Sequence, residues 1–136
     1  MDASGFVVEP IGVVRSPLRS RVDAPRRASQ GPAAVLEIDE RFAAALDGID
    51  AGTDLVLVTW LHEAARDVRQ VHPGRDPEAL LKGVFATRSP DRPNPVGIHR
   101  VTVTAVEPPA RLHVAALEAI DGTPILDLKI GIDSDW

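Results

Sequence analysis

Short segments rich in β-branched and other apolar residues follow one another closely along this chain, with turn-forming residues between them. This succession limits the fold more than any other feature, because each segment is typical of a β-strand. Many short strands at close spacing predict an all-β protein, either a small barrel or a sandwich. The predicted strands span residues 6–15, 33–38, 54–61, 66–71, 82–87, 96–106, 111–118 and 125–130.

Helical patterns are scarce. One short helix is predicted at residues 40–47, where Asp39 can cap its start and Gly48 can end it. Residues 76–81 are expected to add one further helical turn. A doubly wound dinucleotide-binding fold is disfavoured, because strands do not alternate with long helices and no G-x-G-x-x-G motif is present.

The segment 54–61 is nearly continuous in apolar residues, which predicts a strand buried on both faces. Residues 66–71 are expected to be its antiparallel neighbour. His62 and Glu63 close this strand, and a histidine beside an acid can bind a ligand or move a proton. From periodicity alone, a histidine hydrogen-bonded to backbone at a barrel rim is the favoured interpretation.

Composition excludes several classes of function. With 136 residues, a single domain is expected. The chain has no cysteine, so disulfides, zinc–thiolate sites and thiol catalysis are excluded. The net charge of −5 gives no global field that would attract nucleic acid, although a local arginine patch can act alone. No membrane span or signal peptide can be recognised, and a cytoplasmic location is expected.

Residues 88–94 form a polar loop that contains two arginines and two prolines, and Pro95 follows. Proline fixes φ, so three prolines make this loop stiff. A stiff loop with guanidinium donors suits a planar or anionic ligand. A rigid hairpin connection with solvated charges explains the pattern equally well, and the residues alone leave both interpretations open.

Two other groups have a possible chemical role and a simpler alternative. The loop 16–32 contains four arginines that can meet phosphates or an acidic partner, or can be solvated. Asp127 and Lys129 lie two apart, so their side chains share one face of a strand and can position a substrate or form a weak surface ion pair. The remaining histidines lack metal-ligand spacing, so no metal site is predicted; they are His72, His99 and His113.

Four segments together carry a resemblance to a known family. They are IGVVRSP at 11–17, the buried strand ending in His62, GVFATRSPDRPNPVGI at 83–98, and DGTPILDLK at 121–129. In this order they resemble the TrmO (TsaA-like) family of S-adenosylmethionine-dependent tRNA methyltransferases. The resemblance implies a small β-barrel with one or two short helices that dimerises, with the cofactor in a cleft near the dimer interface.

The resemblance also implies an activity and a set of site residues. The activity is N-methylation of threonylcarbamoyladenosine, the modified base beside the anticodon of certain tRNAs. Glu118 stands where the family commonly has Asp, and its carboxylate can accept from a ribose hydroxyl or from the methionine ammonium. The implied cofactor-binding residues are Ala28, Ser29, Gln30, His62, Glu63, Arg88, Ile98, Ala115, Ala116, Leu117 and Glu118.

Catalysis in such a site is mostly alignment, because the sulfonium is already an activated methyl donor. Asn94 or Asp127 is expected to orient the acceptor, and Lys129 to contact a carboxylate or phosphate of the substrate.

The chain departs from the family in its last strand, which runs Asp-Leu-Lys-Ile-Gly at 127–131 instead of Asp-Ile-Lys-Pro-Tyr. It also ends at Trp136, where better-known bacterial members continue, so one barrel domain over residues 1–136 is expected. The alternatives are the same scaffold methylating a small metabolite, and a non-catalytic module that binds a nucleotide.

Overall fold

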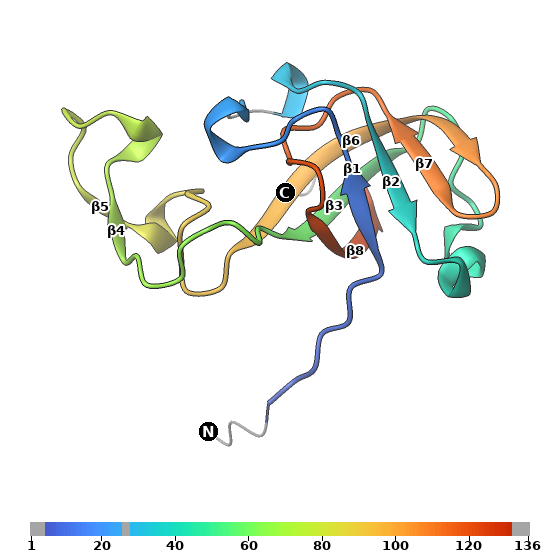
Figure 1. The fold of residues 1–136 in the computed structure, drawn as a ribbon, viewed down its shortest axis with the longest axis horizontal. Helices are drawn as coiled ribbons and strands as arrows, with labels where there is room; N and C mark the ends of the chain where they lie inside the picture. Colours follow the sequence, from blue (N-terminus) through green and yellow to red (C-terminus); the bar gives the residue numbers. More distant parts are fainter. Residues whose placement is uncertain (1–4, 26–27, 132–136) are drawn as a thin grey trace.

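Six antiparallel strands form a ring in which each strand is hydrogen-bonded to two neighbours (Figure 1). The computed structural model describes residues 5–25 and 28–131. Since β8 pairs with β1 as well as with β3, the ring closes, and the predicted small β-barrel is confirmed. In order around the ring the strands are β1 Gly12–Arg15, β2 Ala34–Ile38, β7 Arg111–Val114, β6 Val96–Glu107, β3 Asp54–Trp60 and β8 Pro124–Ile130.

Alternation along the strands builds the core. In the first half of β6 every second residue is buried, which places Gly97, His99, Val101 and Val103 toward the interior. Large aliphatic side chains from the other strands meet them there, each contributing about 2 kcal/mol by burial. The side chains that are fully buried include Leu36, Leu57, Leu112, Val114, Leu117 and Ile125.

The helical segments of the described residues are all 3₁₀ turns. The predicted helix at 40–47 is η3 (Glu40–Leu46), and the side chain of Asp39 accepts from the backbone N–H of Arg41, as expected of a cap. Seven residues are too few to repay the cost of starting an α-helix, and short segments commonly take the tighter 3₁₀ form. The other turns are η1 Arg21–Asp23, η2 Ala28–Gln30, η4 Pro73–Arg75 and η5 Val84–Ala86.

The strands predicted at 6–15 and 111–118 are both longer than the observed ones. Of the predicted strand at 6–15, only Ile11 and β1 have backbone partners, and residues 6–10 are exposed, with Phe6 99% accessible. The strand predicted at 111–118 ends at Val114. Its backbone then turns to other partners, since the N–H of Leu117 donates to the carbonyl of Pro32.

The chain between β3 and β6, residues 61–95, leaves the barrel and is called the arm below (Figure 1). The prediction that 66–71 pairs with 54–61 is wrong, because β6 and β8 occupy both edges of β3. Instead β4 (Gln70–Val71) pairs with β5 (Lys82–Gly83) in a separate two-stranded sheet.

Two further predictions for the arm need correction. The strand expected at 82–87 is β5 followed by η5. The helical turn expected at 76–81 is a non-helical turn, in which the carboxylate of Asp76 accepts from the N–H of Glu78. None of the described helices is long and apolar enough to cross a membrane.

Candidate functional site

Three polar side chains form a hydrogen-bonded chain that starts in the barrel interior, near the end where β3 stops and β6 starts, and ends at the partly exposed Glu118. Oγ1 of Thr59 lies 2.8 Å from Nε2 of His99, and Nδ1 of His99 contacts Oε1 of Glu118. Thr59 is fully buried and His99 is 6% exposed. An ionised carboxylate only accepts, so this pairing assigns a proton to Nδ1, and the hydroxyl of Thr59 can then donate to Nε2.

Local sequence explains why these groups meet. Thr59 and His99 both occupy inward positions of paired strands, β3 and β6. Gly97 lies directly opposite Thr59, and its missing side chain leaves the space that the two polar groups use. A Cβ at Gly97 would lie 2.5 Å from Oγ1 of Thr59 and 2.8 Å from Nε2 of His99.

The second oxygen of Glu118 lacks a partner. Oε2 is buried, and among the described residues it is the one buried side-chain polar atom with no hydrogen bond. A buried acceptor without a donor costs free energy, about 1–3 kcal/mol. The site therefore suits a ligand that brings an O–H or N–H donor to Glu118.

The loop of residues 16–32, called the first loop below, packs against the backbone of Glu118. Gly31 follows η2, and a Cβ there would lie 2.0 Å from the carbonyl oxygen of Leu117 and 2.8 Å from the nitrogen of Glu118. This contact holds Ser29 and Gln30, both exposed, beside the segment 115–118. Of this predicted loop, Arg26, Arg27 and the side chain of Ala28 lie outside the described residues.

The segment 115–118 is anchored on both sides. The N–H of Ala115 donates to the carbonyl of Thr102, and Leu117 is fully buried. Ala115 itself is exposed, and Ala116 is half-buried. The backbone that carries Ala115 and Glu118 is therefore held in place.

His62 and Glu63 follow β3 and are both exposed. The carbonyl of Glu63 accepts from the guanidinium of Arg21, which ties the first loop to this strand end. Nε2 of His62 lies 4.0 Å from the Cβ position of Gly122, so His62 lies beside the turn that precedes β8. Within the described residues no hydrogen bond of the His62 ring is found, so the backbone-bonded interpretation gains no support.

The two arginines of the loop 88–94 have different surroundings. Arg92 donates to three backbone carbonyls of the arm, those of Ser89, Val84 and Thr87, at 2.8, 2.6 and 2.7 Å. Arg88 is exposed and forms no hydrogen bond or ion pair within 5–25 and 28–131. Arg92 is therefore structural, and the Arg88 guanidinium is available to a ligand.

Asp91 fastens the arm to the first loop. Its carboxylate lies 2.9 Å from Nη2 of Arg21 and accepts from the N–H of Ala65 at 2.8 Å. Burial raises the pKa of Asp91, but the hydrogen bonds from Arg21 and Ala65 and the charges of Arg21 and Arg75 outweigh it and hold the pKa below its ordinary value.

The remaining predicted residues are not gathered around Glu118. Ile98 points to the outer face of β6, opposite in direction to His99, and is 53% exposed. Asp127 and Lys129 are exposed on β8, where they pair with Val58 and Val56 of β3.

Asn94 is exposed at the end of the arm. Its side-chain oxygen accepts from Nη2 of Arg66 at 3.1 Å, so its amide nitrogen is the group left for a substrate. The guanidinium of Arg66 also lies 5.0 Å from the ring centre of Trp60, which fixes this part of the arm against the end of β3.

Sequence reasoning missed Thr59 and His99. The available signal was the alternation in 96–106, which places His99 on the same face as Val101 and Val103 and therefore in the core. A buried imidazole needs a partner for each nitrogen. Its partners come from 40 residues before and 19 residues after in the chain, and no local pattern identifies them.

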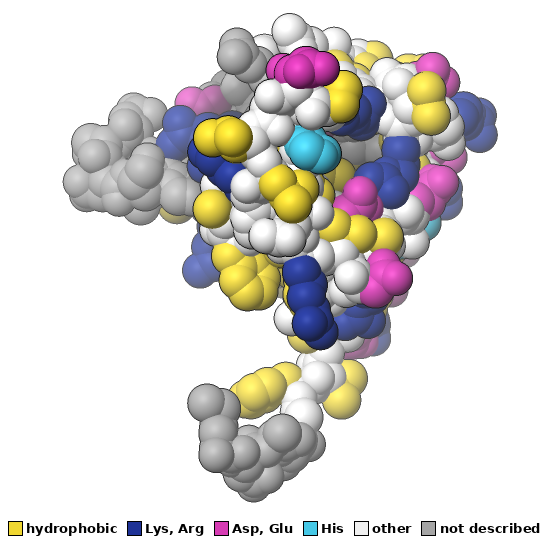
Figure 2. Space-filling view, turned by 90° about the vertical axis from the view of Figure 1, so that its left-hand side faces the viewer, with side chains coloured by type: hydrophobic (Ala, Val, Ile, Leu, Met, Phe, Trp, Pro, Cys, Tyr) yellow, Lys and Arg dark blue, Asp and Glu magenta, His cyan; other side chains and the backbone are white. Residues whose placement is uncertain are grey.

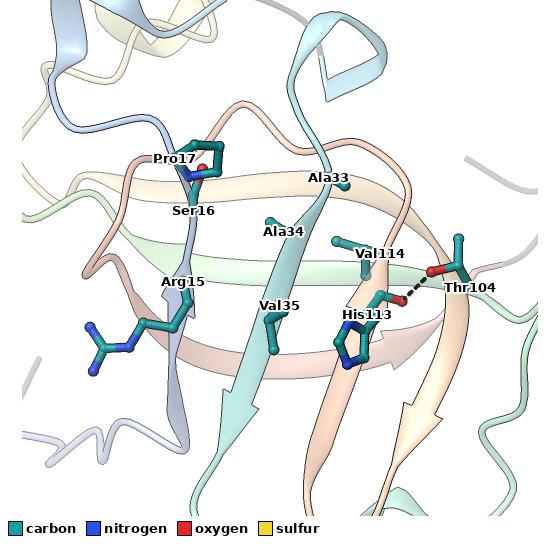
Figure 3. A pocket seen from close by; sticks show the side chains of 9 residues that line it. All are labelled: Arg15, Ser16, Pro17, Ala33, Ala34, Val35, Thr104, His113 and Val114. Carbon is teal, nitrogen blue, oxygen red and sulfur yellow. Dashed lines mark hydrogen bonds between the residues drawn. The ribbon is translucent and has the colours of Figure 1, made fainter.

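A separate open hollow of about 320 Å³ lies on the side of the barrel formed by four neighbouring strands (Figure 3). It is lined by β1, β2, β7 and β6, and Thr104 donates to the carbonyl of His113 at its edge. Its ionisable side chains already have partners, Arg15 with Glu37 and His113 with Glu107. None of the predicted cofactor residues lines it. No cluster of His, Asp and Glu suited to a metal ion occurs in the described part of the chain.

Comparison with known proteins gives one family. The sequence matches the model described as the tRNA-methyltransferase O N-terminal domain over residues 13–133. VirR of Rhizobium radiobacter, described as a probable S-adenosyl-L-methionine-binding protein, is 43% identical over 129 residues that cover 94% of this chain and 70% of VirR. An S-adenosyl-L-methionine-binding protein of Archaeoglobus fulgidus is 40% identical over 126 residues, covering 91% of this chain and 88% of that protein.

Solved structures give the same result for the fold. TrmO from Pseudomonas aeruginosa superimposes with a TM-score of 0.77 at 29% identity, covering 96% of this chain and 58% of that one. Another TrmO crystal structure superimposes with a TM-score of 0.76 at 31% identity, covering 94% and 58%. The chain thus spans less than two thirds of the length of these solved structures.

Proposed function

Because the chain belongs to the family of tRNA-methyltransferase O N-terminal domains, we propose that it is an S-adenosyl-L-methionine-dependent methyltransferase. The observation that carries this proposal is the buried, partner-free oxygen of Glu118, located where the resemblance implies a cofactor contact. The S-adenosyl-L-methionine-binding relatives support the choice of cofactor.

The residues present fit this cofactor. Glu118 accepts from a ribose hydroxyl or from the ammonium group, and the exposed guanidinium of Arg88 pairs with the carboxylate of the amino-acid part. Ser29, Gln30 and His62 are exposed, and Gly31 holds the loop of the first two against the backbone of Leu117 and Glu118. The other members of the proposed cofactor set are Ala28, Glu63, Ile98, Ala115, Ala116 and Leu117.

When bound, the cofactor supplies a methyl group activated by its sulfonium. The protein then needs to hold an acceptor in line with that group and keep it there. The Asn94 amide and the Asp127 carboxylate are proposed to orient the acceptor nitrogen, and Lys129 to hold an anionic group of the substrate. All three side chains are exposed, which this role requires.

The proposed acceptor is threonylcarbamoyladenosine beside the anticodon of tRNA. The family description supports a tRNA acceptor, and the exposed arginines of the arm, Arg88 among them, can meet its phosphates. A small metabolite is the second candidate acceptor. The net charge of −5 favours this second candidate, because a negatively charged protein does not attract the polyanionic tRNA through its overall charge.

A homodimer is part of the proposal. Figure 1 draws the arm extended away from the barrel. The arm carries Arg88, whereas Glu118 lies on the connection between β7 and β8 of the barrel. The arm also exposes large apolar side chains, with Leu80 82% and Phe85 84% accessible. Figure 2, which views the molecule from this side, has hydrophobic side chains exposed among charged ones. A second copy would cover these residues and can bring its Arg88 to the site.

Methyl transfer from labelled S-adenosyl-L-methionine tests the proposal. The acceptors are tRNA that carries threonylcarbamoyladenosine, the same tRNA without the modification, and a small-molecule extract. We expect transfer to the modified tRNA only, and loss of transfer in Glu118→Gln. Transfer to the extract alone would replace the tRNA acceptor by a metabolite, and cofactor binding without transfer to any acceptor would leave a nucleotide-binding module.

A further inference from the structure

The partner of Glu118 inside the barrel has no role in the function proposed so far. His99 contacts one carboxylate oxygen of Glu118 and leaves the other without a partner. Thr59 holds the far nitrogen of the same imidazole at 2.8 Å. Among the buried residues of the described chain, Thr59 and His99 are two of only four that are polar or charged, the others being Ser16 and Thr123.

This arrangement restricts how Glu118 can turn. A glutamate side chain has three rotatable bonds and loses freedom when it binds a ligand. Here one oxygen is already held by an imidazole that is itself fixed between strands β3 and β6. Binding a ligand through the other oxygen then needs little further ordering, and such preorganisation raises affinity.

We propose that His99 is a positioning residue for cofactor binding: held by Thr59, its Nδ1–H fixes Oε1 of Glu118 so that Oε2 faces the donor group of the cofactor. This inference rests on the proposed function, because it assumes that Glu118 contacts the cofactor. The donor is an O–H or N–H group, either a ribose hydroxyl or the ammonium of the amino-acid part.

Calorimetric titration tests this role with two probes. S-adenosylhomocysteine has both the ribose and the amino group, whereas 5′-methylthioadenosine has only the ribose. We expect His99→Leu to weaken S-adenosylhomocysteine binding about tenfold. Equal weakening for both probes assigns Glu118 to the ribose, and weakening confined to S-adenosylhomocysteine assigns it to the ammonium.

Conservative variants separate positioning from general damage to the fold. His99→Asn keeps an N–H donor for Glu118 and should bind within about threefold of wild type, whereas Thr59→Val should bind more weakly than His99→Asn. In a double-mutant cycle, His99→Leu should add almost nothing to Glu118→Gln, because His99 acts on the cofactor only through the acceptor oxygen that Glu118→Gln replaces by an amide N–H donor. If His99→Leu does not fold, His99→Asn and Thr59→Val supply the comparison.

Nitrogen NMR of ¹⁵N-histidine-labelled protein shows which ring nitrogen of His99 carries the proton, without any ligand. We expect His99 to be protonated at Nδ1 in wild type and its ring resonances to move in Glu118→Gln. A proton on Nε2 alone, or wild-type affinity in a folded His99→Leu, would overturn the inference while the proposed function stands. If wild-type protein bound neither probe, the proposed function would fail, and the ligand role of His99 with it.

Discussion

Gly97 is the residue on which the packing of the buried polar chain depends most directly. A Cβ at this position would lie 2.5 Å from Oγ1 of Thr59 and 2.8 Å from Nε2 of His99, closer than real Cβ contacts. Neither group can move into solvent, because Thr59 is fully buried and His99 nearly so. Gly97→Ala is therefore expected to lower the free energy of unfolding by about 1–3 kcal/mol, as overpacked core variants do.

Urea unfolding followed by circular dichroism measures this change, and Gly83→Ala is the matched control. The Cβ added at Gly83 meets only the carbonyl of Arg69, at 3.9 Å, so its effect should stay within about 0.5 kcal/mol. Equal free energies of unfolding for Gly97→Ala and Gly83→Ala would contradict the inference that Thr59 and His99 need the space left by Gly97.

Individual site residues differ in how far the sequence could identify them. The pattern of 88–94 identified a stiff loop with guanidinium donors, but it treated its arginines alike. The family resemblance singles out Arg88, and the structure gives the physical reason: Arg92 holds the loop together, whereas Arg88 is left exposed. The spacing of histidines along the chain gives no sign of the role of His99, because its partners Thr59 and Glu118 are distant in sequence and differ in chemistry.

At the level of elements, the contact between the arm and the first loop depends on the ionised carboxylate of Asp91. Hydrogen bonds and cationic neighbours hold its pKa below the ordinary value of 3.8 despite burial. A lowered native pKa stabilises the fold at any pH above that ordinary value. The stabilisation is lost as the pH falls through the native pKa.

Asp91→Asn should therefore destabilise the protein at neutral pH, by about 1 kcal/mol for a partly exposed ion pair. The difference between wild type and Asp91→Asn should shrink once the pH falls below 3.8, because wild type then loses the same charge. Urea unfolding of both proteins at neutral and acidic pH measures this difference. A difference that stays constant with pH would show that the charge of Asp91 is not involved.

Strand order explains which elements the sequence could predict. Long alternating segments such as 96–106 were placed correctly, since their inward residues are set by the pleat itself. The predicted pairing of 66–71 with 54–61 is wrong, because segments that are neighbours in sequence are not neighbours in this sheet. The actual neighbours of β3 are β6 and β8, whose pairing depends on closing the whole barrel.

For the molecule as a whole, the exposed apolar side chains of the arm predict self-association. Sedimentation equilibrium should give about 29 kDa, twice the chain mass of 14.6 kDa. The double variant Leu80→Ser, Phe85→Ser should shift the mass toward the monomer without lowering its stability, because both side chains are more than 80% exposed in the single chain. A monomeric wild type at micromolar concentration would contradict the proposed dimer.

We propose that this barrel binds S-adenosyl-L-methionine through the free oxygen of Glu118. Calorimetric titration of the cofactor into wild type, Glu118→Gln and Glu107→Gln tests it directly, with Glu107 as an exposed glutamate of β6 outside the site. Saturable binding is expected in wild type and Glu107→Gln, with affinity reduced about tenfold or more in Glu118→Gln. No binding to wild type, or equal affinity in all three proteins, would contradict the claim.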